Sequence, residues 1–118
     1  MRDLLVQSAG ILALAVSVVH GMLGETKVFR RVRIEPEWGR RLIRLVWHAG
    51  TVAWMGFAVL LIAAPSFGSD AARTWIVAVS IVAFGCAAIA NAWATRGRHF
   101  GWMAMALVVG LAAAGVSP

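Results

Sequence analysis

The chain has 118 residues, of which 61% are hydrophobic and only 14% charged. A water-soluble domain of this length needs more polar surface than so few charges provide, so we expect a lipid bilayer to surround most of its side chains. One cysteine cannot form an intrachain disulfide, and no Cys/His spacing indicates a structural zinc site. The net charge of +6 comes from basic residues that flank apolar stretches, which indicates membrane topology and not nucleic-acid binding.

The first apolar run covers residues 4–23. Twenty helical residues reach ~30 Å, which is the thickness of the hydrocarbon layer. The run is too long for the apolar part of a cleaved signal peptide, Asp3 offsets Arg2, and no Ala-x-Ala site follows it. We therefore expect it to be a transmembrane helix that stays in the mature protein.

Three further apolar runs cover residues 42–64, 74–95 and 101–116. Pro65 ends the first of these, and the last is the shortest and carries no charge. The second and third connections are short, so neighbouring helices should run antiparallel. The prediction is an all-α membrane protein: a single domain over residues 1–118 with four transmembrane helices in an up-down-up-down bundle.

The basic residues predict the orientation of this bundle. Two of the eleven Lys and Arg residues, Arg2 and Arg73, lie on one side of the predicted membrane. The other nine lie in the loop 24–41, at the start of the second span, or after the third: Lys27, Arg30, Arg31, Arg33, Arg40, Arg41, Arg44, Arg96 and Arg98. Loops with an excess of Lys and Arg stay on the cytoplasmic side of the membrane. We therefore expect a bacterial-type inner membrane protein with loop 24–41 in the cytoplasm and both termini periplasmic or extracellular.

The basic loop 24–41 contains an amphipathic stretch. Val28, Phe29 and Val32 share one helical face, opposite a face of Lys and Arg residues. This pattern is typical of a segment on a membrane surface, which makes anionic lipid headgroups the expected partner. The alternative is a solvated loop with ordinary positive-inside charge. In either case Glu35-Pro36-Glu37 predicts that a helix restarts there.

Small residues repeat every four positions on three of the four spans, a spacing that lets transmembrane helices approach closely. These stripes are Ala9, Ala13, Ser17 and Gly21, then Ala83, Ala87 and Asn91, and finally Ala106, Gly110 and Ala114. Some should face the bundle interior, and one remains for a second copy of the chain. We expect a homo-oligomer or a subunit of a larger membrane complex, although alanine-rich helices match this spacing by chance.

Two histidines are predicted at similar depth near the cytoplasmic side, His20 on the first span and His48 on the second. Antiparallel helices would bring them together, with Glu25 arriving from the loop. Two imidazoles and a carboxylate suit a transition metal such as zinc, copper or non-haem iron. Alternatively, the two histidines are axial ligands of a b-type haem. The third alternative is structural, in which each histidine hydrogen-bonds to a neighbouring helix or a headgroup.

Six other residues are predicted to lie close to this cluster and to line a ligand cavity: Arg44, Thr51, Met55, Asn91, Arg96 and His99. Asn91 has the competing role of bridging two helices through its amide. Cys86 lies among small apolar residues, so we expect no redox role for it.

Four spans in about 110 residues resemble the small multidrug resistance transporters, which work as dimers around a membrane-embedded glutamate in their first helix. This sequence has Gln7 and Ser8 in that part of its first span, and none of its spans contains an acidic residue. That resemblance therefore does not carry proton-coupled drug export over to this chain. We expect a membrane protein without enzyme activity that binds a small ligand, metal or haem, or that acts as an accessory subunit. The alternative function is an oligomeric transporter of small solutes with a basic cytoplasmic entrance.

Overall fold

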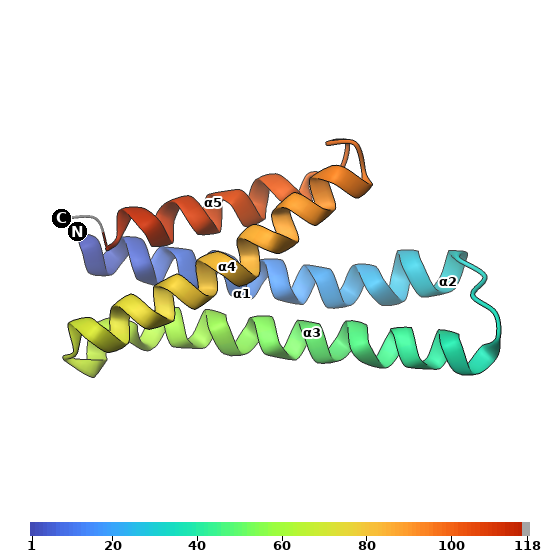
Figure 1. Cartoon of the computed structure of the whole chain (residues 1–118), viewed down its shortest axis with the longest axis horizontal. Helices are drawn as coiled ribbons and strands as arrows, with labels where there is room; N and C mark the ends of the chain where they lie inside the picture. The colour runs from blue at the N-terminus through green and yellow to red at the C-terminus, as the bar shows by residue number, and fades with distance from the viewer. Residues whose placement is uncertain (117–118) are drawn as a thin grey trace.

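The computed structural model describes residues 1–116, which contain four helices of 14 or more residues and no strand (Figure 1). The helices are α1 (Arg2–Leu23), α3 (Glu37–Ala63), α4 (Asp70–Ala94) and α5 (Gly101–Ala114). The first three are long and apolar enough to cross a membrane, whereas α5 has 14 residues and reaches only ~21 Å. Thus α5 ends before the predicted limit of residue 116, and the last two residues of the predicted domain lie outside the described part.

The segment 24–41, predicted as a loop, is largely helical. A π-helical turn, η1 (Gly24–Val28), and a short helix, α2 (Phe29–Arg31), continue α1. The reason is apolar burial, because Phe29 is only 2% exposed and packs edge-on against the Trp47 ring. Arg40 adds a hydrogen bond to the Phe29 carbonyl. Residues 32–36 are the non-helical part, and α3 begins at Glu37, as the Glu35-Pro36-Glu37 sequence predicts.

Helices α1 and α3 lie side by side and form the largest interface in the bundle (Figure 1). The small stripe on α1 makes this possible, because Ala9, Ala13 and Ser17 are all fully buried. At Gly10 the two backbones are so close that an added Cβ would meet the Ala58 carbonyl oxygen and the Ile62 nitrogen at 2.8 Å. The first predicted stripe therefore faces the interior of the bundle.

Helices α4 and α5 pair closely with each other, and α5 also packs on α1. A 3₁₀ turn, η2 (Ala64–Phe67), joins α3 to α4, and from there α4 runs diagonally across to the start of α5 (Figure 1). Helices α3 and α4 consequently share a smaller interface. The core consists of two groups of buried side chains: Val6, Ala9, Leu61, Ala64, Val77 and Ala112 in one, and Ala13, Ala58, Phe84, Ala88, Met105 and Val108 in the other.

One arginine connects three helices at the end of the bundle where the chain begins. Arg73, near the start of α4, forms an ion pair with Asp3 of α1. It also donates a 3.0 Å hydrogen bond to the carbonyl of Gly115, directly after α5. This end of the molecule is therefore held together by polar contacts, and the predicted ligand residues lie toward the opposite end.

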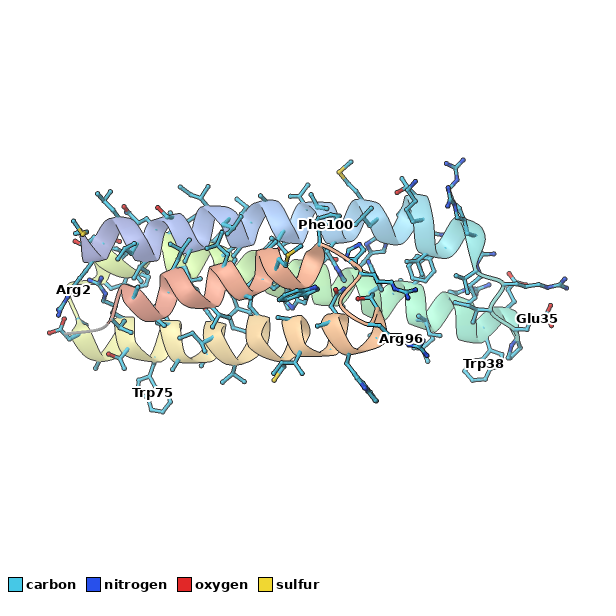
Figure 2. The ribbon with its side chains drawn as sticks, turned by 90° about the horizontal axis from the view of Figure 1, so that it is seen from above. Arg2, Glu35, Trp38, Trp75, Arg96 and Phe100 are labelled. Atoms are coloured by element: carbon cyan, nitrogen blue, oxygen red, sulfur yellow. The ribbon has the colours of Figure 1, made fainter. Side chains whose placement is uncertain are left out.

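The outer surface of the bundle is strongly apolar. Large hydrophobic side chains are exposed on every helix; Trp93 is 85% exposed, and Trp75 points away from the ribbon (Figure 2). Ala106, Gly110 and Ala114 are also exposed, and a Cβ at Gly110 would meet no atom within 4 Å. The third predicted stripe of small residues therefore lies on the outside of the bundle, and the homo-oligomer stays a prediction.

Candidate functional site

The imidazole of His20 lies between two tryptophans of α3. Its ring stacks on Trp47 with centroids 4.1 Å apart and planes 5° apart. The Trp54 ring lies 4.6 Å away on a tilted plane. These contacts fix the orientation of His20 through aromatic packing.

The sequence of α3 explains why these tryptophans meet α1. Residues 47, 51, 54, 58 and 61 follow the alternating three- and four-residue spacing that places side chains on one helical face. Trp47 also donates a 3.1 Å hydrogen bond from Nε1 to the His20 carbonyl. Gly24 leaves room for the indole, since any Cβ there would overlap the Trp47 ring.

A second polar group, the Glu25 cluster, consists of Glu25, Arg44 and His48. Arg44 donates from Nε and Nη2 to the two carboxylate oxygens of Glu25, each at 2.8 Å. His48 Nε2 lies 2.6 Å from Glu25 Oε1. Glu25 follows the apolar run that ends at Leu23, and the hydrogen bonds from Arg44 and then His48 lower the pKa of its carboxyl group.

Glu25 is the second residue of the π-helical turn that follows α1. Arg44 and His48 are four residues apart on α3 and thus present their side chains on the same face. The three groups form a bidentate ion pair with an added imidazole, and they link the end of α1 to the first half of α3.

Of the predicted His20, Glu25 and His48 site, the structure brings Glu25 and His48 into direct contact, whereas the His20 ring packs on tryptophan rings. Within residues 1–116, no group of three or more His, Cys, Asp or Glu side chains is arranged to hold a metal ion. Both carboxylate oxygens of Glu25 already accept hydrogen bonds from the positively charged Arg44 guanidinium. A metal or a b-type haem at these residues stays a prediction.

His20 also lines a cavity of about 240 Å³ between α1, α3, α4, the α4–α5 connection and α5. Most of its lining is apolar, and the polar contributors are His20, Asn91 and His99. Among the lining residues, Val19 is 40% exposed and Phe100 56% exposed. Figure 2 shows Phe100 at the start of α5, next to α1. The complete lining is Leu12, Ala15, Val16, Val19, His20, Leu23, Trp54, Asn91, His99, Phe100, Gly101, Ala104 and Met105.

Two of the polar lining groups are held close together by Gly101. His99 Nδ1 accepts a 3.0 Å hydrogen bond from the Gly101 N–H, and its ring stacks on Phe100 at 4.7 Å. A Cβ at Gly101 would meet His99 Nδ1 at 2.8 Å and Asn91 Nδ2 at 3.6 Å. Asn91 Oδ1 is buried and has no hydrogen-bond partner among the described residues.

The remaining predicted lining residues lie elsewhere. Thr51 is buried in the α1–α3 interface beside Gly21 and donates to the Trp47 carbonyl at 3.1 Å. Arg44 belongs to the Glu25 cluster, and Met55 is half-buried on α3 outside the cavity lining. Arg96 is exposed at the end of α4 (Figure 2).

Sequence reasoning missed Trp54, Phe100 and Met105 as cavity residues. The spacing of residues 47, 51 and 54 contains a signal for Trp54, because it places that side chain on the face of α3 that meets α1. No comparable pattern indicates Phe100, which lies in an irregular connection. No family model, curated protein sequence or solved structure matches this chain.

Proposed function

We propose that this chain is an integral membrane protein that binds a small lipid-soluble ligand in the cavity lined by His20, Asn91 and His99. The observation that carries this proposal is the convergence of these three polar side chains, from α1, α4 and the α4–α5 connection, on one largely apolar cavity. Such cavities, with a few polar groups among apolar walls, are the usual form of small-molecule sites.

Membrane insertion is supported by the helices and by their surface. Three helices have the length and composition of membrane spans, and large apolar side chains cover the outside of the bundle. In water this surface would be a severe aggregation hazard, whereas in lipid it is the expected one. The short α5 packs on α1 and α4, so it has helical neighbours over its length.

The proposed orientation in a bacterial inner membrane follows the basic residues. The π-helical turn, the short α2 and the start of α3 carry most of the Lys and Arg side chains. The positive-inside rule assigns this end to the cytoplasm, so the cavity would lie near the cytoplasmic surface. Both termini would then be periplasmic or extracellular, and the basic end would contact anionic headgroups.

The size of the cavity favours a small ligand. Its volume of about 240 Å³ lies below the ~300–1,000 Å³ typical of sites for drug-sized molecules. One substituted ring suits this volume better than a macrocycle such as haem. Because Val19 and Phe100 both line the cavity and are exposed on the outside of the bundle, we propose that a lipid-soluble ligand enters beside them, laterally from the membrane.

The Glu25 cluster supports a structural role next to this site. Its bidentate ion pair and the Trp47–His20 contacts link α1 to α3 at neighbouring positions. We therefore assign to the Glu25 cluster the task of holding His20 at the cavity wall. The chain then acts as a binding protein or as a ligand-carrying accessory subunit.

Bromobenzene tests the proposal, because bromine quenches the fluorescence of a tryptophan that it contacts. Wild-type protein in lipid nanodiscs should show a saturable quenching component in addition to the linear quenching by bromobenzene dissolved in the lipid. Trp54 lines the cavity. The saturable component should therefore disappear in Trp54→Phe and persist in Trp93→Phe, which removes an exposed tryptophan outside the cavity.

A pair of alanine substitutions provides the matched control. Ala104 lines the cavity, so Ala104→Leu should fill part of it and abolish saturable quenching. Ala78 is exposed on α4, and the same change there should leave quenching unaltered. Purely linear quenching in the wild-type protein would overturn the cavity as a binding site. An absorption spectrum and elemental analysis of the same sample would detect haem or a stoichiometric metal.

A further inference from the structure

We infer that the connection between α4 and α5 binds the phosphate group of an anionic phospholipid through Arg96 and Arg98. This inference rests on the membrane insertion in the proposed function and is independent of the ligand in the cavity. The attraction of the basic end to anionic headgroups is general, whereas this site holds one lipid phosphate between two named side chains.

Arg96 and Arg98 are both exposed, and their guanidinium groups have no hydrogen-bond or ion-pair partner within the described part of the chain. A guanidinium group in this state can form two parallel hydrogen bonds with phosphate oxygens. Other arginines at the same end of the bundle already have partners: Arg33 pairs with Glu35, Arg40 with the Phe29 carbonyl, Arg41 with Glu37, and Arg44 with Glu25.

The connection lies at the depth expected for lipid phosphates. Residues 74–95, almost all of them in α4, carry no charge and reach ~33 Å, close to the ~30 Å of the hydrocarbon layer. Arg73 and Arg96 would therefore lie at the two edges of this layer. The basic side chains of η1 and α2 belong to a segment that extends past the α4–α5 connection, which would place them farther from the phosphates (Figure 1).

Arg96 has a backbone conformation that usually belongs to glycine. Its N–H donates to the Trp93 carbonyl at 3.2 Å, and the N–H of Gly97 donates to the Ala92 carbonyl at 2.7 Å. This pattern ends helices with one left-handed residue, and here that residue is Arg96, with a φ of 52°. A glycine would adopt this conformation without strain. A task for the side chain, such as binding a phosphate, explains why an arginine is present.

Two tryptophans border the connection. Trp102 donates a 3.0 Å hydrogen bond from Nε1 to the carbonyl of Gly97, which lies between the two arginines. Trp93, in the last turn of α4, is 85% exposed. A Cβ at Gly97 would meet no atom within 4 Å, so the backbone between the arginines is open to a headgroup. Tryptophans are enriched at this level of membrane proteins, where their rings lie among the headgroups.

Phosphatidylglycerol with bromine near the top of its acyl chains tests the inference, because it quenches any tryptophan that it contacts. The protein is placed in bilayers of phosphatidylglycerol and phosphatidylcholine, and only one of the two lipids is brominated at a time. The signal of Trp93 is the difference between each protein and the same protein with Trp93→Phe. At Trp93, wild-type protein should bind phosphatidylglycerol in preference to phosphatidylcholine.

Charge-matched variants assign this preference to the site. Arg98→Gln should lower the preference for phosphatidylglycerol roughly fivefold, the usual effect of one basic side chain at an anionic surface. Arg33→Gln removes the same charge from a side chain that is already paired with Glu35, so it should leave the preference at Trp93 unchanged. Equal preferences in wild type, Arg98→Gln and Arg33→Gln would overturn the site.

Arg96→Gly separates phosphate binding from a structural role. The substitution relieves the left-handed backbone, so Tm in a neutral detergent should rise by a few °C. The preference for phosphatidylglycerol should fall as it does in Arg98→Gln. A lower Tm together with an unchanged lipid preference would show that the Arg96 side chain is structural, and would contradict the inference.

Soluble phosphates distinguish a lipid from a free anion. Neither inorganic phosphate nor glycerol 1-phosphate should reduce quenching by brominated phosphatidylglycerol, and competition by either would overturn a site for lipid. Protein that does not associate with bilayers at all would overturn the proposed membrane insertion. Loss of the lipid preference alone would leave the cavity proposal in place, because saturable quenching by bromobenzene tests the cavity separately.

Discussion

Trp47 holds His20 through two contacts at once. Its indole ring stacks on the imidazole at 4.1 Å, and its Nε1 donates to the His20 carbonyl at 3.1 Å. The hydrogen bond uses a carbonyl at the end of α1, directly before the π-helical turn changes the local hydrogen-bonding pattern. Trp47 therefore fixes both the backbone and the ring of the residue that lines the cavity.

Trp47→Phe keeps an aromatic ring next to His20 but removes the hydrogen bond from Nε1 to the His20 carbonyl. The substitution should therefore lower the stability of the protein. We expect a loss of ~1 kcal/mol in the free energy of unfolding, the usual net value of one hydrogen bond. Thermal unfolding in detergent, followed by circular dichroism, would measure this as a lower Tm. The exposed Trp93 provides the control, and Trp93→Phe should leave Tm unchanged. Equal effects of the two changes would argue against the double contact.

Arg44→Lys should lower the Tm of the protein although it preserves the charge. A lysine ammonium cannot form the two parallel hydrogen bonds that the guanidinium makes with Glu25. Arg41→Lys is the matched control, because Arg41 pairs with Glu37 through a single contact of 3.6 Å between two highly exposed side chains. A larger loss in Arg41→Lys than in Arg44→Lys would contradict the role assigned to the Glu25 cluster.

Two glycine substitutions should have opposite effects on stability. Gly10→Ala places a methyl group against the α3 backbone, at 2.8 Å from two of its atoms, so α1 and α3 must separate and Tm should fall. Gly56→Ala adds the same group to the exposed surface of α3, where no atom lies within 4 Å. There the better helix propensity of alanine should stabilise the protein by up to ~1 kcal/mol. Unfolding in detergent measures both, and a harmless Gly10→Ala would disprove the close α1–α3 contact.

A reporter fused after Pro118 should read as periplasmic. Nine of the eleven basic residues lie on the other side of the proposed bundle, and such a difference normally decides orientation. Alkaline phosphatase activity should therefore be high, and a green fluorescent protein fusion at the same point should be dark. The reverse result would move the cavity and the Glu25 cluster to the periplasmic side.

The helices could be predicted from the sequence because each of them coincides with a long apolar run, and the length of that run gives the approximate length of the helix. The helical continuation over residues 24–31 was harder, since its stabilising contacts come from Trp47 and Arg40, which are distant in the sequence. Lys27, Arg30 and Arg31 gave this segment the composition of a loop. Tertiary contacts thus overrode a local pattern.

A similar physical reason explains why His20 packs on tryptophan rings while His48 contacts Glu25. Sequence position gives the depth of His20 and His48 along their helices, but whether their side chains meet depends on rotation about the helix axes. On α3 the residue that faces His20 is Trp47, and the next residue, His48, is turned about 100° away toward Glu25. His99 reaches the cavity through an irregular connection, for which periodicity gives no information.

Nitrogen-15 spectra of histidine-labelled protein test the central claim most directly, because the chain contains three histidines. His20 and His99 line the cavity, whereas His48 belongs to the Glu25 cluster. Titration with bromobenzene in detergent micelles should shift the imidazole signals of His20 and His99 together, with one dissociation constant, and leave the signal of His48 in place. His→Gln variants assign the three signals. A shift of His48 alone, or no saturable shift of any imidazole, would contradict binding in this cavity.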